Sequence, residues 1–254
     1  MTLVQHRFAA EQYGARAQDY VSSAVHSAGP DLDQIEEIVR GQGHARVLDL
    51  GCGGGHVSYR AAPHVAEVVA CDLTPAMLDL VAATATERGL ANIEVRQAPA
   101  EALPFANGAF DFVLCRFTAH HWQNMEAGLR QARRVLKTGG RAVIIDTIAP
   151  ADAVLDTHLQ AMEVLRDASH VRNYSLVEWT GALSRSGFAL QTVNLRKLRM
   201  EFDVWIARTR TPALHAQAIR ALQACAPSVV RDAFDIGENG DFNLDVATFV
   251  LGAS

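Results

Sequence analysis

Residues 47–56 read Val47-Leu48-Asp49-Leu50-Gly51-Cys52-Gly53-Gly54-Gly55-His56 and join a short apolar run to a run of glycines. A short apolar run of this kind is typical of a strand that is buried on both faces of a parallel sheet. A glycine-rich turn directly after such a strand lets a ligand approach the backbone, because no Cβ stands in the way. The stretch therefore predicts an α/β fold with a ligand site at the carboxyl end of its first strand.

The alternation of strands and helices continues on the C-terminal side of this stretch. Further strands are expected at 65–71, 93–97, 110–116 and 141–147, and helices at 74–88 and 125–136. Asn107-Gly108 is a common hairpin turn, but the βαβ rhythm around it predicts parallel neighbours instead. This rhythm indicates a mostly parallel sheet that is covered by helices on both faces.

Beyond residue 150 the pattern changes. Helices are expected near 152–168 and 176–186, a strand at 188–198, a helical stretch at about 203–225 and a last strand at 243–251. We interpret the last two strands as an antiparallel edge of the same sheet. The helices then become additions above its ligand-binding end, and residues 5–26 are expected to be helical as well.

Composition narrows the class of protein. The chain has 254 residues, of which 49% are hydrophobic and 20% charged, and these values suit one large domain with an ordinary core. The net charge of −5 argues against a nucleic-acid partner. The four cysteines show no CxxC spacing and predict reduced thiols. Neither a secretory leader nor an apolar run of about 18 residues is present, so we expect a cytoplasmic protein without a membrane span.

An acidic residue follows the glycines at a meaningful distance. Asp72 ends the second expected strand, about 20 residues after Gly51, where a carboxylate can accept hydrogen bonds from both ribose hydroxyls of an adenosine ligand. The glycine-rich motif of dinucleotide-binding sites requires a third small residue, Gly or Ala, at the position that His56 occupies here. An NAD-linked oxidoreductase is therefore the least favoured reading, and NADH binding without any response to S-adenosylmethionine (SAM) would revive it.

With an aspartate two positions before the first glycine, residues 47–56 closely resemble the first motif of class I SAM-dependent methyltransferases. The resemblance implies that Asp49 steadies the loop and that Asp72 holds the ribose. It also implies that the backbone of Gly51, Cys52 and Gly53 lies against the methionine part of SAM. Leu73 and Met77 would pack on the adenine. Since SAM carries no phosphate, a loop without a phosphate-binding lysine makes chemical sense.

Three further segments carry the same resemblance: 99–105, 110–116 and 134–140. In the first, Pro99 replaces the usual aspartate at the adenine edge. The Ala100 amide is still available to adenine N1, and Glu101 is in place to substitute for the missing carboxylate. The likeness is closest to the ubiquinone/menaquinone-biosynthesis methyltransferases, especially small bacterial members whose substrates are mostly unassigned.

The family has a Rossmann-like fold, with a mostly parallel seven-stranded sheet, an antiparallel C-terminal strand and extra helices. The resemblance implies one methyltransferase domain over residues 1–254. Within it we expect N-terminal lid helices in 1–43, the SAM-binding core in 44–148, and substrate-side helices with the C-terminal strand pair in 149–254.

Methyl transfer from a sulfonium is an in-line displacement, and orientation alone lowers its barrier by about 7–11 kcal/mol. The segment 116–122 is expected to face the methyl group. Phe117 is the candidate sulfonium contact. Adjacent histidines diverge on a helix, so only one is expected to line the site, and His121 is the candidate general base with core packing as the alternative.

Three other features are candidates for contacts in the site. Arg116 is a candidate anchor for the SAM carboxylate or an acidic substrate, and an ordinary ion pair is the alternative. Tyr20 lies in a segment that resembles the lid helix of the family and is a candidate cofactor contact, and a buried core position is the alternative. The polar run 166–172 is a candidate rim of the substrate pocket, and a loop that satisfies its own polar groups is the alternative.

The leading hypothesis is a SAM-dependent methyltransferase that methylates carbon or oxygen of a small molecule, such as a quinone precursor, and releases S-adenosylhomocysteine. The alternative is a non-catalytic SAM-binding sensor or partner subunit, which would bind SAM without turning it over. No metal is called for, because Asp146 lacks the neighbouring carboxylate and Asn of a magnesium-dependent catechol enzyme. A monomer or a homodimer is expected.

Overall fold

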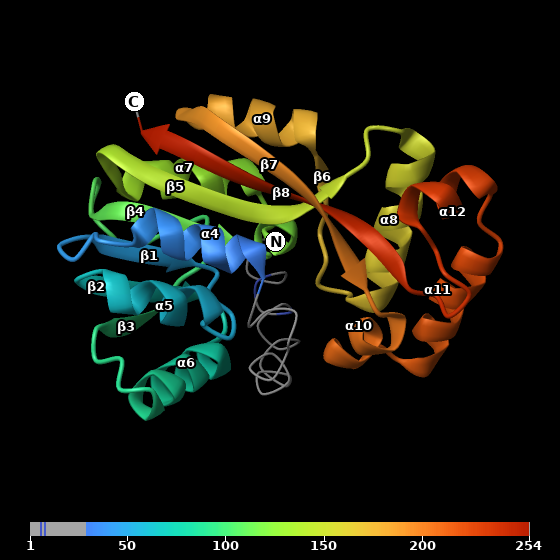
Figure 1. The fold of residues 1–254 in the computed structure, drawn as a ribbon, viewed down its shortest axis with the longest axis horizontal. Coiled ribbons are helices and arrows are strands. Elements are labelled where there is room, and N and C mark those ends of the chain that lie inside the picture. Colours follow the sequence, from blue (N-terminus) through green and yellow to red (C-terminus); the bar gives the residue numbers. More distant parts are fainter. Residues whose placement is uncertain (1–5, 7, 9–28, 254) are drawn as a thin grey trace.

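A mixed sheet organises the molecule, which is described by a computed structural model for residues 6, 8 and 29–253. Along the sheet the strands follow the order β3-β2-β1-β4-β5-β8-β7, and a short β6 pairs with β5 beside this path (Figure 1). The strands are β1 (Arg46–Leu50), β2 (Glu67–Asp72), β3 (Ile93–Gln97), β4 (Phe110–Arg116), β5 (Leu136–Ala149), β6 (Tyr174–Ser175), β7 (Phe188–Met200) and β8 (Phe242–Ala253).

Strand directions confirm the predicted mostly parallel sheet. β1 pairs parallel with β2 on one side and with β4 on the other, so the chain order reverses at β1. β8 runs antiparallel to both of its neighbours, β5 and β7. The predicted antiparallel edge is confirmed, because the last two strands, β7 and β8, pair antiparallel at the end of the same sheet, and β7 regains the direction of the parallel strands. The two-residue β6 was not predicted, because so short a segment carries no periodicity.

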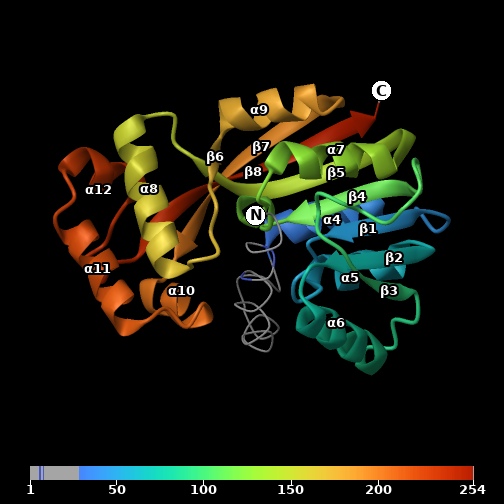
Figure 2. The ribbon, with the colours of Figure 1, turned by 180° about the vertical axis from the view of Figure 1, so that it is seen from behind.

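Helices cover both faces of the sheet, as predicted. One face carries α4 (Pro30–Val39), α5 (His56–Ala61) and α6 (Pro75–Glu87), while α7 (Met125–Val135) and α9 (Leu176–Arg185) lie on the other (Figures 1 and 2). Side chains of β1 alternate between these layers. Val47 packs in the cluster that contains residues of α4, and Leu48 in the cluster that contains residues of α7.

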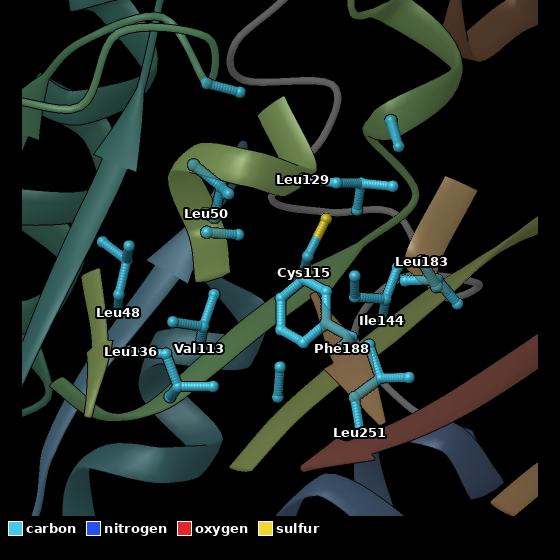
Figure 3. Packing of buried hydrophobic residues seen from close by; sticks show 14 of the residues in the cluster. Leu48, Leu50, Val113, Cys115, Leu129, Leu136, Ile144, Leu183, Phe188 and Leu251 are labelled. Carbon is cyan, nitrogen blue, oxygen red and sulfur yellow. The ribbon is translucent and has the colours of Figure 1, made fainter. Parts of the chain in front are cut away.

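The larger of these clusters fixes the sheet against α7 and α9. Figure 3 shows Leu50, Cys115 and Ile144 from three neighbouring strands meeting Leu129 of α7 and Leu183 of α9. All five side chains are at most 1% exposed. Because β1, β4 and β5 are anchored in this way, their carboxyl ends form a rigid edge on which a site can be built.

A second group of helices lies beyond that edge and is called the helical cap below. It consists of α8 (Ala153–Arg166), α10 (Phe202–Arg208), α11 (Ala213–Ala224) and α12 (Ser228–Phe234) (Figure 1). The cap packs around the ends of β7 and β8 through a separate apolar cluster. The single helical stretch expected at 203–225 is interrupted before Pro212, which lacks an N–H and stands at the N-cap of α11. None of the helices in the described residues has the length and apolarity needed to cross a membrane.

Truncation of Leu129 tests how much the α7 layer contributes. Leu129 is fully buried, so Leu129→Ala is expected to lower the free energy of unfolding by about 2–5 kcal/mol. Leu214 in α11 is 73% exposed, and Leu214→Ala makes the same chemical change with an expected effect within about 0.5 kcal/mol. Urea denaturation followed by circular dichroism measures both, and equal losses would contradict this account of the core.

Candidate active site

The glycine-rich loop after β1 is held by the end of β2. The N–H groups of Gly51 and Cys52 both donate to the Cys71 carbonyl, at 2.8 and 3.0 Å. Gly51 has a φ of +72°. A Cβ at this position would lie 2.3 Å from Thr118 Oγ1, so only glycine fits between the loop and the segment that follows β4.

Gly53, unlike Gly51, has open space next to its Cα. Its φ is +47°, and a Cβ built there would meet nothing within 4 Å. The residue lines a cavity, so its backbone is open to whatever that cavity holds. A side chain at this position would be strained and would occupy the cavity.

Asp49 connects the loop to the helix that follows it. One carboxylate oxygen accepts hydrogen bonds from the Ser58 N–H at 3.0 Å and from the Ser58 hydroxyl at 2.6 Å. Burial raises the pKa of the Asp49 carboxyl to about 7, although the two Ser58 hydrogen bonds favour its charged form. The carboxyl therefore fixes the path of the chain from β1 into α5.

Asp72 stands at the end of β2 and faces the same loop. Its Oδ2 accepts a hydrogen bond from the Gly53 N–H at 2.9 Å, and its Oδ1 accepts one from the Thr74 N–H at 2.8 Å. Burial raises the pKa of this carboxyl above its ordinary value, against the backbone N–H groups that favour the charged form. The carboxylate is thus fixed in orientation beside Gly53.

One cavity brings the candidate residues together and encloses about 200 Å³ that a water molecule can reach. Its wall contains Asp49, Gly51, Cys52, Gly53, Asp72, Leu73, Met77, Pro99, Ala100, Glu101, Arg116, Phe117 and His121. Tyr20 lies outside the described residues. The carboxyl ends of β1, β2 and β4 meet at this cavity, as expected for an open parallel sheet.

Arg116 makes a buried ion pair. Its Nε lies 2.5 Å from Asp31 Oδ2, and both side chains are 5% exposed. Arg196 approaches the same carboxylate at 3.1 Å. The guanidinium also stacks over the Phe117 ring, 4.8 Å from its centroid. Of the two readings considered for Arg116, the geometry matches the ion pair directly, while the residue still borders the cavity.

Phe117 has an unusual backbone conformation, with a φ of +52°. A bulky residue in the left-handed region costs about 1–2 kcal/mol. Its N–H donates to the Ile145 carbonyl at 2.8 Å, so the chain leaves β4 still attached to β5. Such strain persists only where the surrounding structure enforces it, and it concentrates at functional sites.

His120 and His121 both line the cavity, and the expectation that only one does so was wrong. They lie in a short 3₁₀ helix, η2 (Ala119–His121), and their ring centroids are 4.2 Å apart. His120 Nδ1 lies 2.6 Å from Oδ1 of Asp146, a fully buried residue of β5. The ion pair draws the first ring toward the sheet edge, so both rings reach the same space.

The polar run 166–172 also reaches the site. The His120 carbonyl accepts hydrogen bonds from the N–H groups of Val171 and Arg172, at 2.9 and 3.2 Å. His121 Nδ1 lies 3.3 Å from the Ser169 carbonyl. The His170 ring is 5.7 Å from His120 and 6.3 Å from His121, which completes a cluster of three imidazoles.

The three imidazoles have different proton affinities. Burial disfavours the charged form of His120, but the Asp146 carboxylate outweighs burial and raises its pKa above the ordinary value. Burial and the charge of His120 lower the pKa of His121 and of His170 to about 3. The Asp146 carboxylate therefore favours the charged form of His120, whereas burial keeps the neighbouring His121 ring in its neutral form.

A second group of residues lines the cavity, and we call their part of it the cap half. They come from β5, β7, β8, the helical cap and the loop after α8, and are Thr147, Glu163, Arg166, Asn173, Leu198, Met200, Trp205, Arg208 and Leu244. Arg166 belongs to the polar run that was a candidate for the pocket rim, whereas no local pattern marks the others, because long-range packing brings them together. Asp146 carried a usable signal, since an acidic residue at the carboxyl end of a central parallel strand is a recurrent site position.

Comparison with known proteins identifies the family. Residues 48–144 match a methyltransferase domain family. An uncharacterized methyltransferase of Bacillus subtilis, YcgJ, is 35% identical over 89% of this chain and 90% of its own length. The chain belongs to the SAM-dependent methyltransferases. The uncharacterized protein YafE of Escherichia coli is 43% identical to this methyltransferase over 77% of the chain and 95% of the relative.

Two solved structures superpose on most of the methyltransferase. The crystal structure of YcgJ superposes with a TM-score of 0.83 at 34% identity, covering 87% of this chain and 97% of that one. A putative methyltransferase of Bacillus halodurans gives 0.84 at 31% identity, with 88% and 98% covered. The ubiquinone/menaquinone C-methyltransferase UbiE of Coxiella burnetii is 36% identical, but this chain covers only 58% of its length.

The protonation of the histidine cluster is testable by NMR. His121 and His170 are expected to stay neutral from about pH 5 to 8, because their pKa values lie near 3. His120 is expected to lose its proton above its ordinary pKa. In Asp146→Asn the pKa of His120 should fall below the ordinary value, since burial then acts without the carboxylate. Imidazole ¹⁵N shifts report each ring, and a His121 titration near pH 6.5 would contradict this assignment.

Proposed function

We propose that this methyltransferase binds SAM in the cavity and transfers its methyl group to carbon or oxygen of a small-molecule acceptor, releasing S-adenosylhomocysteine. One observation carries the proposal. A single cavity runs from the glycine loop and Asp72 to the histidine cluster and the cap half, so a donor and an acceptor can meet inside it. Orienting the two reactants is the main requirement of such a displacement.

The residues of the sheet edge fit SAM. Gly53 leaves open space at its Cα, and the adjacent Asp72 carboxylate retains lone pairs for ribose hydroxyls. Leu73 and Met77 provide apolar surface for adenine, beside Pro99, Ala100 and Glu101. When bound, SAM supplies a methyl group on a sulfonium sulfur. Phe117 is proposed to face that cation with its ring, as aromatic faces do at a gain of about 0.5–2 kcal/mol.

His121 is proposed to act as the general base. A neutral imidazole carries one N–H, and the Ser169 carbonyl 3.3 Å from Nδ1 is a hydrogen-bond acceptor. This contact favours the tautomer in which Nδ1 donates and Nε2 is basic. Burial and the charge of the adjacent His120 lower the pKa of His121 to about 3, so the ring is neutral. A base this weak is suited to take a proton only from an acidic acceptor hydroxyl or an activated enolisable carbon.

We propose an aromatic or enolisable metabolite as the acceptor. The partial similarity to UbiE, whose name describes C-methylation in quinone biosynthesis, supports a quinone precursor or a compound of similar reactivity. Such acceptors carry acidic protons and become electron-rich once deprotonated, which matches the weak basicity of His121.

Variants of the loop and of Asp72 test the donor site. Asp72→Ala removes the carboxylate, and the loss of two charge-assisted hydrogen bonds is expected to weaken SAM binding at least about 100-fold. Gly53→Arg is expected to abolish binding by filling the cavity. Asp79→Ala, an exposed change on α6, is the matched control and should bind normally. Calorimetry measures affinity and circular dichroism verifies folding. Undiminished affinity in the first two variants would remove the proposed site.

His121→Gln tests the base. We expect turnover to fall about 10²–10⁴-fold while SAM affinity stays unchanged, because the side chain acts on the acceptor. Exposed His44→Gln is the control. Turnover is followed as S-adenosylhomocysteine formed from SAM with a bacterial metabolite extract, which also separates an enzyme from a protein that only binds SAM. Full turnover by His121→Gln would assign the residue to packing.

A further inference from the structure

We infer that the acceptor carries an anionic group, a carboxylate or a phosphate, held by Arg166 and Arg208, and an apolar body that lies along Leu198, Met200 and Leu244. The inference rests on the proposed function, because it describes what occupies the cap half of the same cavity. It is independent of the identity of the base.

Arg166 is fixed at the cavity wall, and its contacts with the described residues leave most of its donors unused. It is the last residue of α8, and its side chain is 13% exposed. Nε donates to the Trp205 carbonyl at 3.1 Å, and the guanidinium stacks over the Trp205 ring at 4.9 Å. Glu163 is 3.5 Å from Nη1, which is long for a charge-assisted hydrogen bond. The remaining N–H groups are available to a ligand.

Arg208 approaches the same space from α10. It lies three residues after Trp205, so the two side chains share one face of the helix. Arg208 is 7% exposed and lines the cavity. The Thr211 hydroxyl donates to the Arg166 carbonyl at 3.0 Å and ties the end of α8 to the chain just after α10. Both arginines therefore line the cavity together with Trp205.

The charges that line the cap half favour an anion. Among its described residues there are two guanidinium groups and a single carboxylate, that of Glu163. A buried anion is stabilised most by guanidinium donors, which bind carboxylates and phosphates in a bidentate manner. A neutral or cationic acceptor would forgo that stabilisation.

Hydrogen-bonding capacity points in the same direction. The Asn173 amide nitrogen and the Trp205 indole nitrogen are buried, and neither has a hydrogen-bond partner among the residues that the structure describes. Both residues line the cavity. Nitrogen donors without acceptors suit a ligand group that offers only acceptors, as a carboxylate or phosphate does.

Another part of the cap half is apolar. Leu198 and Met200 end β7, and Leu244 lies near the start of β8, within the apolar cluster of the cap. A ligand whose anionic group reaches the arginines therefore contacts aliphatic side chains along its body. This arrangement favours an apolar acid or an apolar phosphate ester over a small hydrophilic anion.

Charge analysis of the product tests the inference. Wild-type protein is incubated with [methyl-³H]SAM and a bacterial metabolite extract, and the labelled product is applied to a strong anion exchanger at neutral pH. We expect the label to be retained. Loss of retention after alkaline phosphatase would assign a phosphate, and unchanged retention a carboxylate. Both results support an anionic acceptor. Label in the unretained fraction would overturn the inference while leaving methyl transfer established.

Arginine variants test the location of the anion. With the acceptor-enriched fraction, Arg166→Met and Arg208→Met are each expected to raise the apparent KM about 10- to 100-fold, from the loss of charged hydrogen bonds. SAM affinity by calorimetry should not change, which also verifies folding. Arg166→Lys keeps the charge, so its apparent KM should rise less than that of Arg166→Met.

Exposed Arg231→Met on α12 is the control. Unchanged KM in both Met variants would overturn the inference, and absence of any label transfer by wild type would overturn the proposed function with it.

Discussion

The hydrogen bond from the Gly53 N–H to the Asp72 carboxylate is the contact on which the site depends. It joins the glycine loop after β1 to the end of β2, and it exists because parallel neighbouring strands end at the same edge of the sheet. The loop reaches Asp72 only through left-handed backbone at Gly51 and Gly53. The glycines in the sequence, the left-handed loop conformation and the parallel pairing of β1 with β2 are therefore all required for this one hydrogen bond.

Two other strands end in buried carboxyls that organise the turn beside them. Asp49 near the end of β1 accepts from the Ser58 N–H and hydroxyl, and Asp146 in β5 accepts from the Ala119 N–H and holds His120. Buried carboxyls are costly unless they are hydrogen-bonded. Each carboxyl therefore forces its neighbouring segment into a defined geometry. Because the strands fix these carboxyls at the sheet edge, they also fix the positions of the glycine loop and of the His120 ring.

The core and the glycine loop could be predicted from the sequence because their signals are local. Most of the cap half could not, since only the run 166–172 carries a local signal there, and the packing of α8 against the segment after α10 is what brings Arg166 and Arg208 to one cavity. The error over the histidines has a similar origin. Divergence of adjacent side chains was assumed for an α-helix, whereas η2 is one 3₁₀ turn whose first ring is captured by Asp146.

The two halves of the cavity are formed by different parts of the chain, so a relative is able to share one half without the other. Backbone groups and strand ends form the half assigned to the donor, within the segment 48–144 that matches the methyltransferase domain family. Side chains of the cap, of the loop after α8 and of β5, β7 and β8 form the other half, beyond that segment. YcgJ superposes over 87% of the chain, far more than the matched segment, so it shares part of the cap as well. Under the proposed assignment, donor binding constrains only the first half. The acceptor is therefore better inferred from relatives that share the cap than from enzymes that share the first half alone.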